Sequence, residues 1–350
     1  MDKQSRVPPL VLVDTSSLSR EEWLRYRRKG IGGSDAAAIM RISPFRTARD
    51  IYYDKLGIVS ADNADENWVA LRIGSLLEDL VAEIFTRKTG LPVFQIKKMF
   101  QHPTYQFMLA DVDYFVRLPN GKIAILEIKT TNYHAAKHWW KDGEEIVPDY
   151  YESQGRHYMS VMDIDEAFFC CLYGNNEDEV IIRHITRDSI YESEMIYLEQ
   201  SFWEENVLAK VPPDYTENGD LIEASLKRFP GPVSRSPDGL RLSRNSKNYF
   251  VQYLDLQDRK SEIDKASREL EKEMKRLRAL ITADMGQEFT AYCDVGGNSY
   301  KISNHPIRRT EVKKKDLLRL KVLYPEAFQS CATDTEYRMF RVSQNNAEAA

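Results

Sequence analysis

An apolar stretch of the sequence carries two charged residues that could do metal chemistry. Residues 122–129 read KIAILEIK and follow Pro119-Asn120-Gly121, which predicts a short β-strand after a hairpin turn. Because side chains alternate between the two faces of a strand, Glu127 and Lys129 project to the same side. The neighbouring residues are apolar enough to be buried, and a buried charge needs an opposite charge or a metal ion.

A carboxylate in the preceding apolar stretch fits the same chemistry. Asp113 lies in residues 109–116, LADVDYFV, fourteen residues before Glu127. An Asp, a turn and Glu-x-Lys in the next strand is how many nucleases hold a divalent cation, which lies between the two carboxylates. Asp111 is an alternative, because the two-residue period places it on the same face as Asp113. The simpler alternative is an edge strand that turns its charges to solvent.

A predicted helix upstream could add a further carboxylate. Residues 71–89 have the apolar spacing of a helix, and Gly90 ends it. The residues with this spacing are Ile73, Leu77, Leu80 and Ile84. Glu78 flanks the stripe, where it either belongs to a site or is simply solvated.

A second predicted helix lies downstream, over residues 150–162. It places Gln154, Tyr158 and Val161 on one face. On an inner face, Gln154 could hold a phosphate or a metal-bound water. The alternative is a glutamine at the edge of the core that is satisfied by backbone groups.

The N-terminal part of the chain has features of an anion site. Ser19 and Glu22 form a capping box that predicts a helix over residues 20–28. Residues 30–34, GIGGS, then lead into a predicted helix over residues 34–40, whose free N–H groups could bind an anion. The loop lacks the Gly-Lys-Ser/Thr of a P-loop and no strand is predicted before it, so a single phosphate fits better than a nucleotide. Glycines used for close packing are the alternative.

Several motifs follow one another in an order that identifies a family. They are Arg27, Gly30-Ile31-Gly32-Gly33-Ser34-Asp35, Ser43-Pro44, Lys55-Leu56-Gly57, Gly74-Ser75-Leu76-Leu77-Glu78, Asp113, Glu127-Ile128-Lys129, Gln154 and Tyr158. Together they resemble the YqaJ-type viral recombinase nucleases, the lambda exonuclease-like branch of the PD-(D/E)XK, RecB-type superfamily. The resemblance covers about residues 16–210. The sequence departs from the family at Asp113-Tyr114, where relatives often have Asp-Gly, and in its long C-terminal region.

The resemblance implies an α/β fold with a PD-(D/E)XK restriction-endonuclease-like core, a central mixed β-sheet flanked by helices. It also implies a magnesium-dependent alkaline exonuclease that degrades one strand of linear double-stranded DNA from a 5′ end. Such an enzyme would prefer 5′-phosphorylated ends and leave a 3′ overhang for a single-strand annealing partner of the RecT or Bet type. Lambda-like relatives form a closed ring around DNA, which implies a homo-oligomer.

Each candidate residue has an expected role. Hydrolysis of DNA needs an activated water, charge neutralisation and help for the leaving oxygen, which two Mg²⁺ ions about 4 Å apart can supply. The expected metal ligands are Glu78, Asp113, Glu127 and the main-chain carbonyl of Ile128, and Mn²⁺ should substitute for Mg²⁺. Lys129 would position the attacking water, and Gln154 would steady that water or the phosphate.

The resemblance also assigns an end-binding site. In relatives, the Arg and Ser of the N-terminal motif hold the terminal 5′-phosphate, and these positions match Arg27 and Ser34 here. Arg28 is the alternate to Arg27. Tyr158 belongs to the same DNA-binding group.

Composition limits the broad class of the protein. The chain has 350 residues and is 42% hydrophobic, enough for a sizeable core and for two domains. Its four Cys lack the spacing of a metal site, which argues against an iron–sulfur nuclease. There is no signal peptide and no apolar run near the roughly 20 residues of a membrane span. We therefore expect a cytoplasmic protein of a bacterial host cell, encoded by a phage or prophage.

The net charge of −5 does not exclude DNA binding, because the local distribution of charge decides it. Two stretches are basic: residues 20–29, and residues 301–321 with the sequence KISNHPIRRTEVKKKDLLRLK. The first stands beside the glycine-rich loop. For the second, a solvated charged surface is the alternative to a DNA contact.

We expect five segments along the chain. They are an extended lead-in at 1–15, the nuclease domain at 16–210, a turn-rich linker at 211–245, a long helix or coiled-coil arm at 246–285 and a small α+β module at 286–350. The strands predicted for the nuclease domain are residues 92–101, 105–117, 122–131, 166–173 and 179–186. In the long helix, Leu256, Ile263, Leu270 and Leu277 recur every seven residues, which indicates a coiled-coil surface or a helix lying on its own nuclease domain.

Two other functions remain open at this point. An endonuclease of the same superfamily, of restriction or repair type, would share Asp113, Glu127 and Lys129 but cut DNA internally. The Arg27 and Ser34 positions favour the exonuclease, since only an end-binding enzyme needs them. A nonenzymatic DNA-binding or scaffold protein is the third class, and the intact acidic pair with its lysine argues against it.

Overall fold

The computed structural model describes residues 7–60, 68–231, 240–308 and 314–331. These residues belong to two compact units, Met1–Arg235 and Ser236–Ala350. All of the candidate site residues lie in the first unit. In the described part of the chain, no helix is long and apolar enough to cross a membrane.

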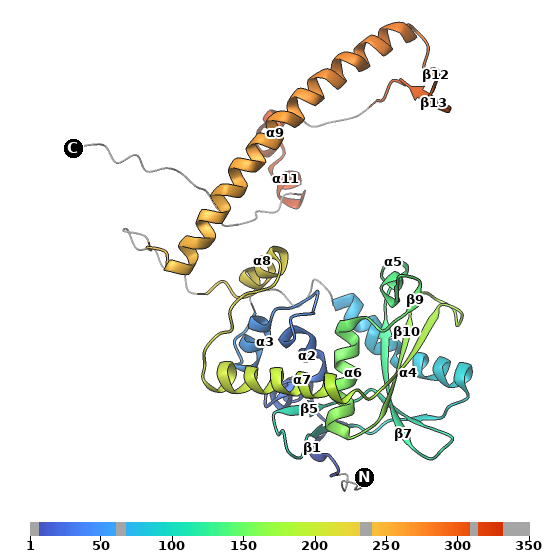
Figure 1. Ribbon diagram of the computed structural model, residues 1–350, viewed down its shortest axis with the longest axis vertical. Helices are drawn as coiled ribbons and strands as arrows, with labels where there is room; N and C mark the ends of the chain where they lie inside the picture. The colour runs from blue at the N-terminus through green and yellow to red at the C-terminus, as the bar shows by residue number, and fades with distance from the viewer. Residues whose placement is uncertain (1–6, 61–67, 232–239, 309–313, 332–350) are drawn as a thin grey trace, which may run out of the picture. The chain divides into compact units, whose positions relative to one another are not determined.

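A five-stranded mixed sheet forms the centre of the first unit (Figure 1). Its order is β11 (Val180–Thr186), β10 (Glu166–Leu172), β7 (Ile123–Thr130), β6 (Tyr114–Arg117) and β3 (Val93–Phe94). Strands β7 and β10 are parallel, whereas the other neighbours are antiparallel. The predicted α/β core, a mixed sheet flanked by helices, is confirmed.

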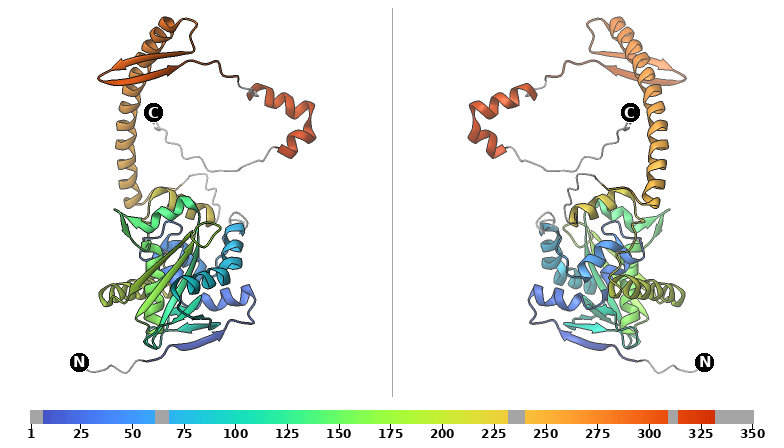
Figure 2. Two further views of the ribbon diagram at one scale, coloured as in Figure 1. Left: turned by 90° about the vertical axis from the view of Figure 1, so that its right-hand side faces the viewer. Right: turned by 90° about the vertical axis from the view of Figure 1, so that its left-hand side faces the viewer.

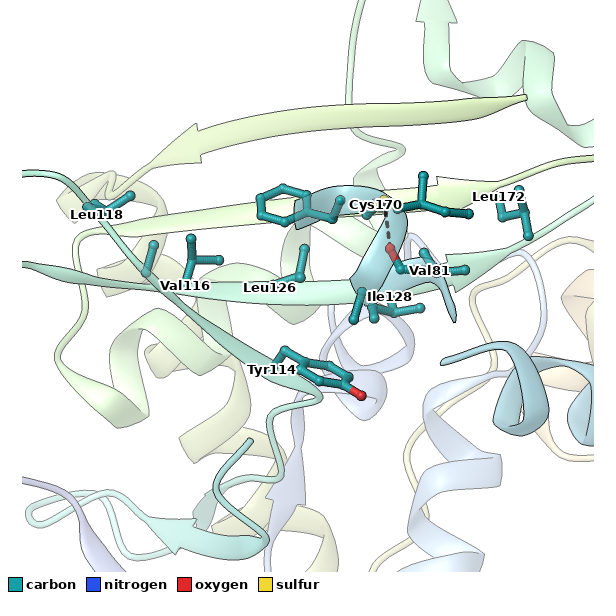
Figure 3. Close-up of a cluster of buried hydrophobic side chains, with 12 residues drawn as sticks. Val81, Tyr114, Val116, Leu118, Leu126, Ile128, Cys170 and Leu172 are labelled. Carbon is teal, nitrogen blue, oxygen red and sulfur yellow. Dashed lines mark hydrogen bonds between the residues drawn. The ribbon is translucent and has the colours of Figure 1, made fainter. Parts of the chain in front are cut away.

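Helices cover both faces of this sheet, and strand β7 divides its side chains between them. Leu126 and Ile128 face α4 (Trp68–Thr89), where they pack with Val81 (Figure 3). Phe85 of α4 belongs to the same cluster. The alternate residues, Ile125 among them, face α6 (Asp149–Met162). Truncation of a core residue such as Leu126 to Ala would cost roughly 2–5 kcal/mol. The alternation therefore puts Glu127 and Lys129 on the α6 face.

A second, four-stranded sheet lies beside the first and corrects three predictions. Its order is β1 (Leu10–Asp14), β4 (Lys98–Gln101), β5 (Met108–Ala110) and β2 (Ile31–Gly32). The predicted strands 92–101 and 105–117 are each divided between the two sheets, and part of the expected lead-in is strand β1. The chain leaves the second sheet at Ala110 and joins the first at Tyr114. Between them, Asp111 and Asp113 turn their side chains to polar partners described below, while Val112 packs in the core.

Three short helices follow β1: α1 (Arg20–Arg27), α2 (Gly33–Ile39) and α3 (Ala48–Lys55). The predicted capping box is confirmed, since Ser19 accepts from the backbone of Glu22 and Glu22 accepts from the backbone of Ser19. The glycines of the loop allow close packing. A Cβ at Gly30 would lie 2.4 Å from the carbonyl oxygen of Phe107, and one at Gly33 would lie 2.6 Å from the ring of Tyr158.

Helix α4 departs from the predicted apolar stripe. Its buried side chains are Val81, Ala82, Ile84 and Phe85. The predicted core residues Ile73 and Leu80 are 45% and 46% exposed. For Ile73 the reason is length: 22 residues extend about 33 Å, and the buried side chains all belong to the second half of the helix. Leu80 lies in that half but beside the buried set.

One helix lies within the turn-rich linker expected at 211–245. Helix α7 (Ser189–Ser201) continues as the π-helix η2 (Phe202–Leu208), and α8 (Gly219–Arg228) then falls inside that linker. Helix α8 packs on the first unit: Ser225 is buried there and Arg228 pairs with Asp50. The remaining elements of the unit are α5 (Tyr133–Ala136), η1 (Lys137–Trp139), β8 (Trp140–Lys141) and β9 (Glu144–Glu145).

The second unit contains the predicted long helix, and the small module after it begins with a hairpin. Helix α9 (Arg244–Met285) runs without a break (Figure 2). The hairpin β12 (Thr290–Val295) and β13 (Asn298–Ser303) follows, and then α10 (Lys314–Leu323) and α11 (Pro325–Cys331). The sequence also predicts a strand at 336–342 in this module, and these residues lie outside the described ones.

Candidate active site

One cavity of about 510 Å³ collects most of the candidate residues. It opens between the N-terminal helices, α4, α6 and the segment that joins the two sheets. The candidate residues that line it are Arg27, Ser34, Glu78, Asp113, Gln154 and Tyr158. Residues from five separate parts of the sequence therefore meet at one place.

The strand pair places Glu127, Lys129 and Asp113 together. The Lys129 Nζ lies 3.0 Å from Oε2 of Glu127, which confirms that the two side chains share a face. The β6–β7 ladder ends at the pair Tyr114–Leu126. Beyond that pair, the N–H of Ile128 donates to Oδ2 of Asp113 at 2.9 Å. The Asp113 side chain thus takes the place of a strand neighbour and lies beside β7.

Helix α6 supplies a further contact to the same carboxylate. The Gln154 amide donates to Oε2 of Glu127 at 2.7 Å, so Gln154 is on the inner face that the sequence predicted. The Tyr158 side chain is buried one turn later. Burial, together with Glu127 and Asp113, holds the pKa of Tyr158 well above its usual value, so its hydroxyl stays protonated.

The carboxyl groups of Glu127 and Glu78 resist ionisation in the absence of a cation. Burial, and then the charge of Asp113, raises the pKa of Glu127 to about 8. The same two causes, in the same order, raise the pKa of Glu78 to about 7. Burial would lower the pKa of the Lys129 ammonium, but Glu127 and Asp113 outweigh it and the pKa is raised. Lys129 therefore stays positively charged beside Glu127 and Asp113.

The donor atoms fit a hard divalent cation. The Oε1 atom of Glu127 is buried and has no hydrogen-bond partner among the described residues. In the same part of the chain, no three His, Cys, Asp or Glu side chains converge closely enough to hold a metal by themselves. Mg²⁺ commonly uses only one or two carboxylates and keeps several waters, so Asp113 and Glu127 with carbonyl and water oxygens suit it.

A charge cluster fixes Arg27 and Ser34 at the cavity wall. The Arg27 guanidinium donates to Ser34 Oγ, and to Asp35 Oδ1 at 2.7 Å. The other oxygen of Asp35 accepts from Lys55 Nζ at 2.7 Å and from the N–H of Gly32 at 3.0 Å. Burial alone would raise the pKa of Asp35, but Arg27 and Lys55 outweigh it and hold the pKa below its usual value. The cluster keeps one positive charge in excess.

Arg28, the alternative to Arg27, pairs with a residue of α3 instead of Ser34. Arg28 Nε lies 3.4 Å from Oδ1 of Asp54 on α3. Asp35 and Lys55, which hold Arg27, appear in the motifs that carried the family resemblance, but their position relative to one another was not evident in the sequence.

Trp23 is a cavity residue that sequence reasoning missed. Its Nε1 donates to Oδ2 of Asp111 at 2.6 Å, and the Arg27 guanidinium carbon lies 5.4 Å from the centre of its ring. Asp111 is thus held by Trp23, whereas Asp113 is held by β7. The one available signal was spacing, since residues 23 and 27 are one helical turn apart.

A buried ion pair behind the cavity was also missed. The Nδ1 of His157 lies 2.8 Å from Oε1 of Glu199, and its Nε2 lies 3.0 Å from the carbonyl oxygen of Leu109. Both partners are acceptors, so both ring nitrogens donate. Burial would lower the pKa of His157, but Glu199 outweighs it and the pKa is raised. This contact joins α6 and α7 to β5, two residues before Asp111.

The fold and the cavity can now be set beside known proteins. The mixed sheet carries Asp113 beside the Glu127–Lys129 pair, next to a cavity rich in carboxylates. Residues 22–165 match the YqaJ-like viral recombinase domain. The chain is 31% identical over 336 residues to the uncharacterized protein YqaJ of Bacillus subtilis (strain 168), covering 95% of this chain and 97% of that protein. The chain therefore belongs to the YqaJ-like viral recombinase family.

Solved structures are similar to part of this chain. An alkaline exonuclease of Laribacter hongkongensis, LHK-Exo, is 20% identical, with a TM-score of 0.43, over 55% of this chain and 94% of that chain. A phage-related exonuclease of Haemophilus somnus 129PT is 13% identical, with a TM-score of 0.37, over 52% of this chain and 96% of that chain.

Proposed function

We propose that this chain is a magnesium-dependent exonuclease that degrades the 5′-ended strand of linear double-stranded DNA. The observation that carries the proposal is the single cavity shared by two groups of residues. One wall holds the Arg27–Ser34 pair, which suits a terminal phosphate. The other wall holds Asp113 and Gln154, and Gln154 is hydrogen-bonded to Glu127 behind it. These residues suit phosphodiester hydrolysis.

The expected metal ligands keep their assignment. Asp113, Glu127 and the carbonyl of Ile128 would hold one Mg²⁺, and Glu78 would contribute to a second. When bound, divalent cations supply charge neutralisation at the scissile phosphate and a more acidic water. Mn²⁺ has the same preference for oxygen ligands and should substitute.

The chain's own side chains then have separate tasks. Lys129, oriented by Glu127, donates to the attacking water or to a phosphate oxygen. Gln154 keeps Oε2 of Glu127 in place, so the other oxygen of this carboxylate stays directed to a ligand. Arg27 offers the terminal phosphate N–H donors in a planar fork, which recognises phosphate by shape as well as charge.

The 3′ overhang left by such an enzyme is the substrate of a single-strand annealing protein. We propose a partner of this class, of the RecT or Bet type, and a homo-oligomer that encircles the duplex. An enclosed duplex would account for digestion of many nucleotides in one binding event.

Digestion of a duplex labelled separately on each strand tests the proposal. The substrates carry a 5′-phosphate or a 5′-hydroxyl, in Mg²⁺ at about pH 8, and a covalently closed circle serves as control. We expect fast loss of the 5′-phosphorylated strand, slower loss of the hydroxyl form and an intact circle. Cutting of the circle, with indifference to the 5′ group, would instead support the endonuclease.

A further inference from the structure

Helix α9 carries an apolar stripe that the described residues of its own unit leave exposed. The helix has 42 residues and none of its side chains is buried within the described part of the chain. At about 1.5 Å per residue it extends about 63 Å. The stripe consists of Leu256, Ile263, Leu270, Met274, Leu277 and Ile281, which are 45–68% exposed. Such a surface is typical of a site of association.

The spacing of the stripe is that of a coiled coil rather than of a helix on a globular surface. Leu256, Ile263, Leu270 and Leu277 occupy one position of four successive heptads, position d. The a positions that alternate with them are Lys260, Ser267, Met274 and Ile281. A repeat of 3.5 residues keeps such a seam facing a partner helix along its whole length.

The charges beside the seam select the partner and its direction. In a parallel pair in register, a g position of one helix lies next to the e position of the following heptad of the other. This sets Arg259 against Asp264 of the second copy, and Glu273 against Arg278 of the second copy. Both contacts occur twice by symmetry and join opposite charges. The other g–e pairs, Gln252 with Gln257 and Ala266 with Glu271, bring no like charges together.

The antiparallel arrangement lacks this complementarity. With full overlap, Leu256 would pack against Ile281 of the other copy. The e positions would then meet each other and set Asp264 against Glu271, which repel. A lysine at an a position, here Lys260, limits assembly to few strands and fixes the register at a cost in stability.

We propose that α9 pairs with α9 of a second copy of this chain, as a parallel, in-register, two-stranded coiled coil. The proposal is independent of the nuclease activity, and it concerns residues 256–281 only. It makes the second unit an interaction module between copies of the chain.

A cysteine cross-link on the full chain tests the pairing directly. The background replaces the exposed Cys293 and Cys331 by Ser, and leaves Cys170 and Cys171, which are buried. We expect Leu256→Cys to form a disulfide-linked dimer under mild oxidation at least ten times faster than Asp258→Cys, which lies on the opposite side of the helix. In an antiparallel pair, residue 256 of one copy lies about 38 Å from residue 256 of the other, so equal rates or no cross-link would overturn the proposal.

A charge exchange tests direction with the same readout, whether or not the nuclease units also associate. In the Leu256→Cys background, Glu273→Arg alone and Arg278→Glu alone each create like-charge contacts, so we expect each to lower the cross-link yield several-fold. The two variants are then mixed, with tags that make the two chains differ in size. The mixed dimer again joins opposite charges, so the yield of cross-linked mixed dimer should be restored. Lys265→Glu, at an outer position, should leave it unchanged. Full yield from either single variant, or no restoration in the mixture, would contradict the parallel pair.

Discussion

Gln154 and Lys129 donate to the same oxygen of Glu127, at 2.7 Å and 3.0 Å. Two donors on Oε2 leave the buried Oε1 atom without a partner among the described residues. An unsatisfied buried carboxylate oxygen is costly, and a cation that binds there would remove the cost. The arrangement thus orients Glu127 before any ligand arrives.

The two aspartates of residues 111–113 should differ in their effect on cleavage. Asp113→Asn should lower the cleavage rate by at least about 100-fold, a loss comparable to removal of one stabilising group at a reacting centre. Asp111→Asn should lower it less than about 10-fold, because its carboxylate is held by Trp23 and not by β7. Single-turnover digestion of linear duplex with saturating Mg²⁺ measures both rates. A larger loss from Asp111→Asn would reverse the assignment.

Arg27 should set the preference for a 5′-phosphate. Arg27→Lys keeps a cation beside Asp35 but loses the planar fork, so kcat/KM on the 5′-phosphorylated duplex should fall about 10- to 100-fold, as expected for lost charged hydrogen bonds of about 1.5–3 kcal/mol. The rate on the 5′-hydroxyl duplex should change little. Arg28→Lys is the matched control, since Arg28 pairs with Asp54. If Arg28→Lys abolished the preference and Arg27→Lys kept it, Arg28 would be the phosphate ligand.

The His157–Glu199 pair should make stability depend on pH. The folded-state pKa of His157 is raised above 6.5, so its contribution is fully present below pH 6.5 and is lost as the pH rises through the raised value. Compared with the neutral pair His157→Gln/Glu199→Gln, the advantage of the wild type in the free energy of unfolding should fall by up to about 1.4 kcal/mol per pH unit across that interval. Urea unfolding at pH 6 and pH 9 measures it. An advantage that grew with pH would mean that His157 is neutral in the folded protein.

Removal of divalent cations should abolish cleavage without unfolding the protein. The first unit has its own core around Leu126 and Phe85, so a chelator should leave the circular dichroism spectrum unchanged. Mg²⁺ or Mn²⁺ should restore the rate. Cleavage that continued after exhaustive chelation would rule out the metal-dependent mechanism.

Local patterns in the sequence predicted the directions of the side chains on β7 and α6 correctly. The two-residue period put Glu127 and Lys129 on one face, and the helical period put Gln154 on the inner face of α6; both follow from geometry within one element. The seven-residue repeat and the boundaries of α9 were also predictable, because they too depend on a pattern within one element.

Contacts between distant segments could not be read in this way. Lys55 reaches Asp35 across 20 residues, and Trp23 reaches Asp111 across 88. His157 and Glu199 are 42 residues apart. The division of residues 105–117 between two sheets depends on such contacts, because Asp111 and Asp113 bind partners from α1 and β7. No local period encodes them.

The most direct test of the central claim is the cleavage rate of Glu127→Gln, which keeps the shape of the side chain but removes its charge. The measurement is nucleotide release from linear, 5′-phosphorylated duplex in Mg²⁺, with calorimetry of Mg²⁺ binding to the same protein. Glu83→Gln, on the exposed face of α4, is the control. We predict that Glu127→Gln loses at least about 100-fold in rate and binds Mg²⁺ more weakly, while the control matches the wild type. A Glu127→Gln protein that cleaved within a few-fold of the wild type would contradict the active site described here.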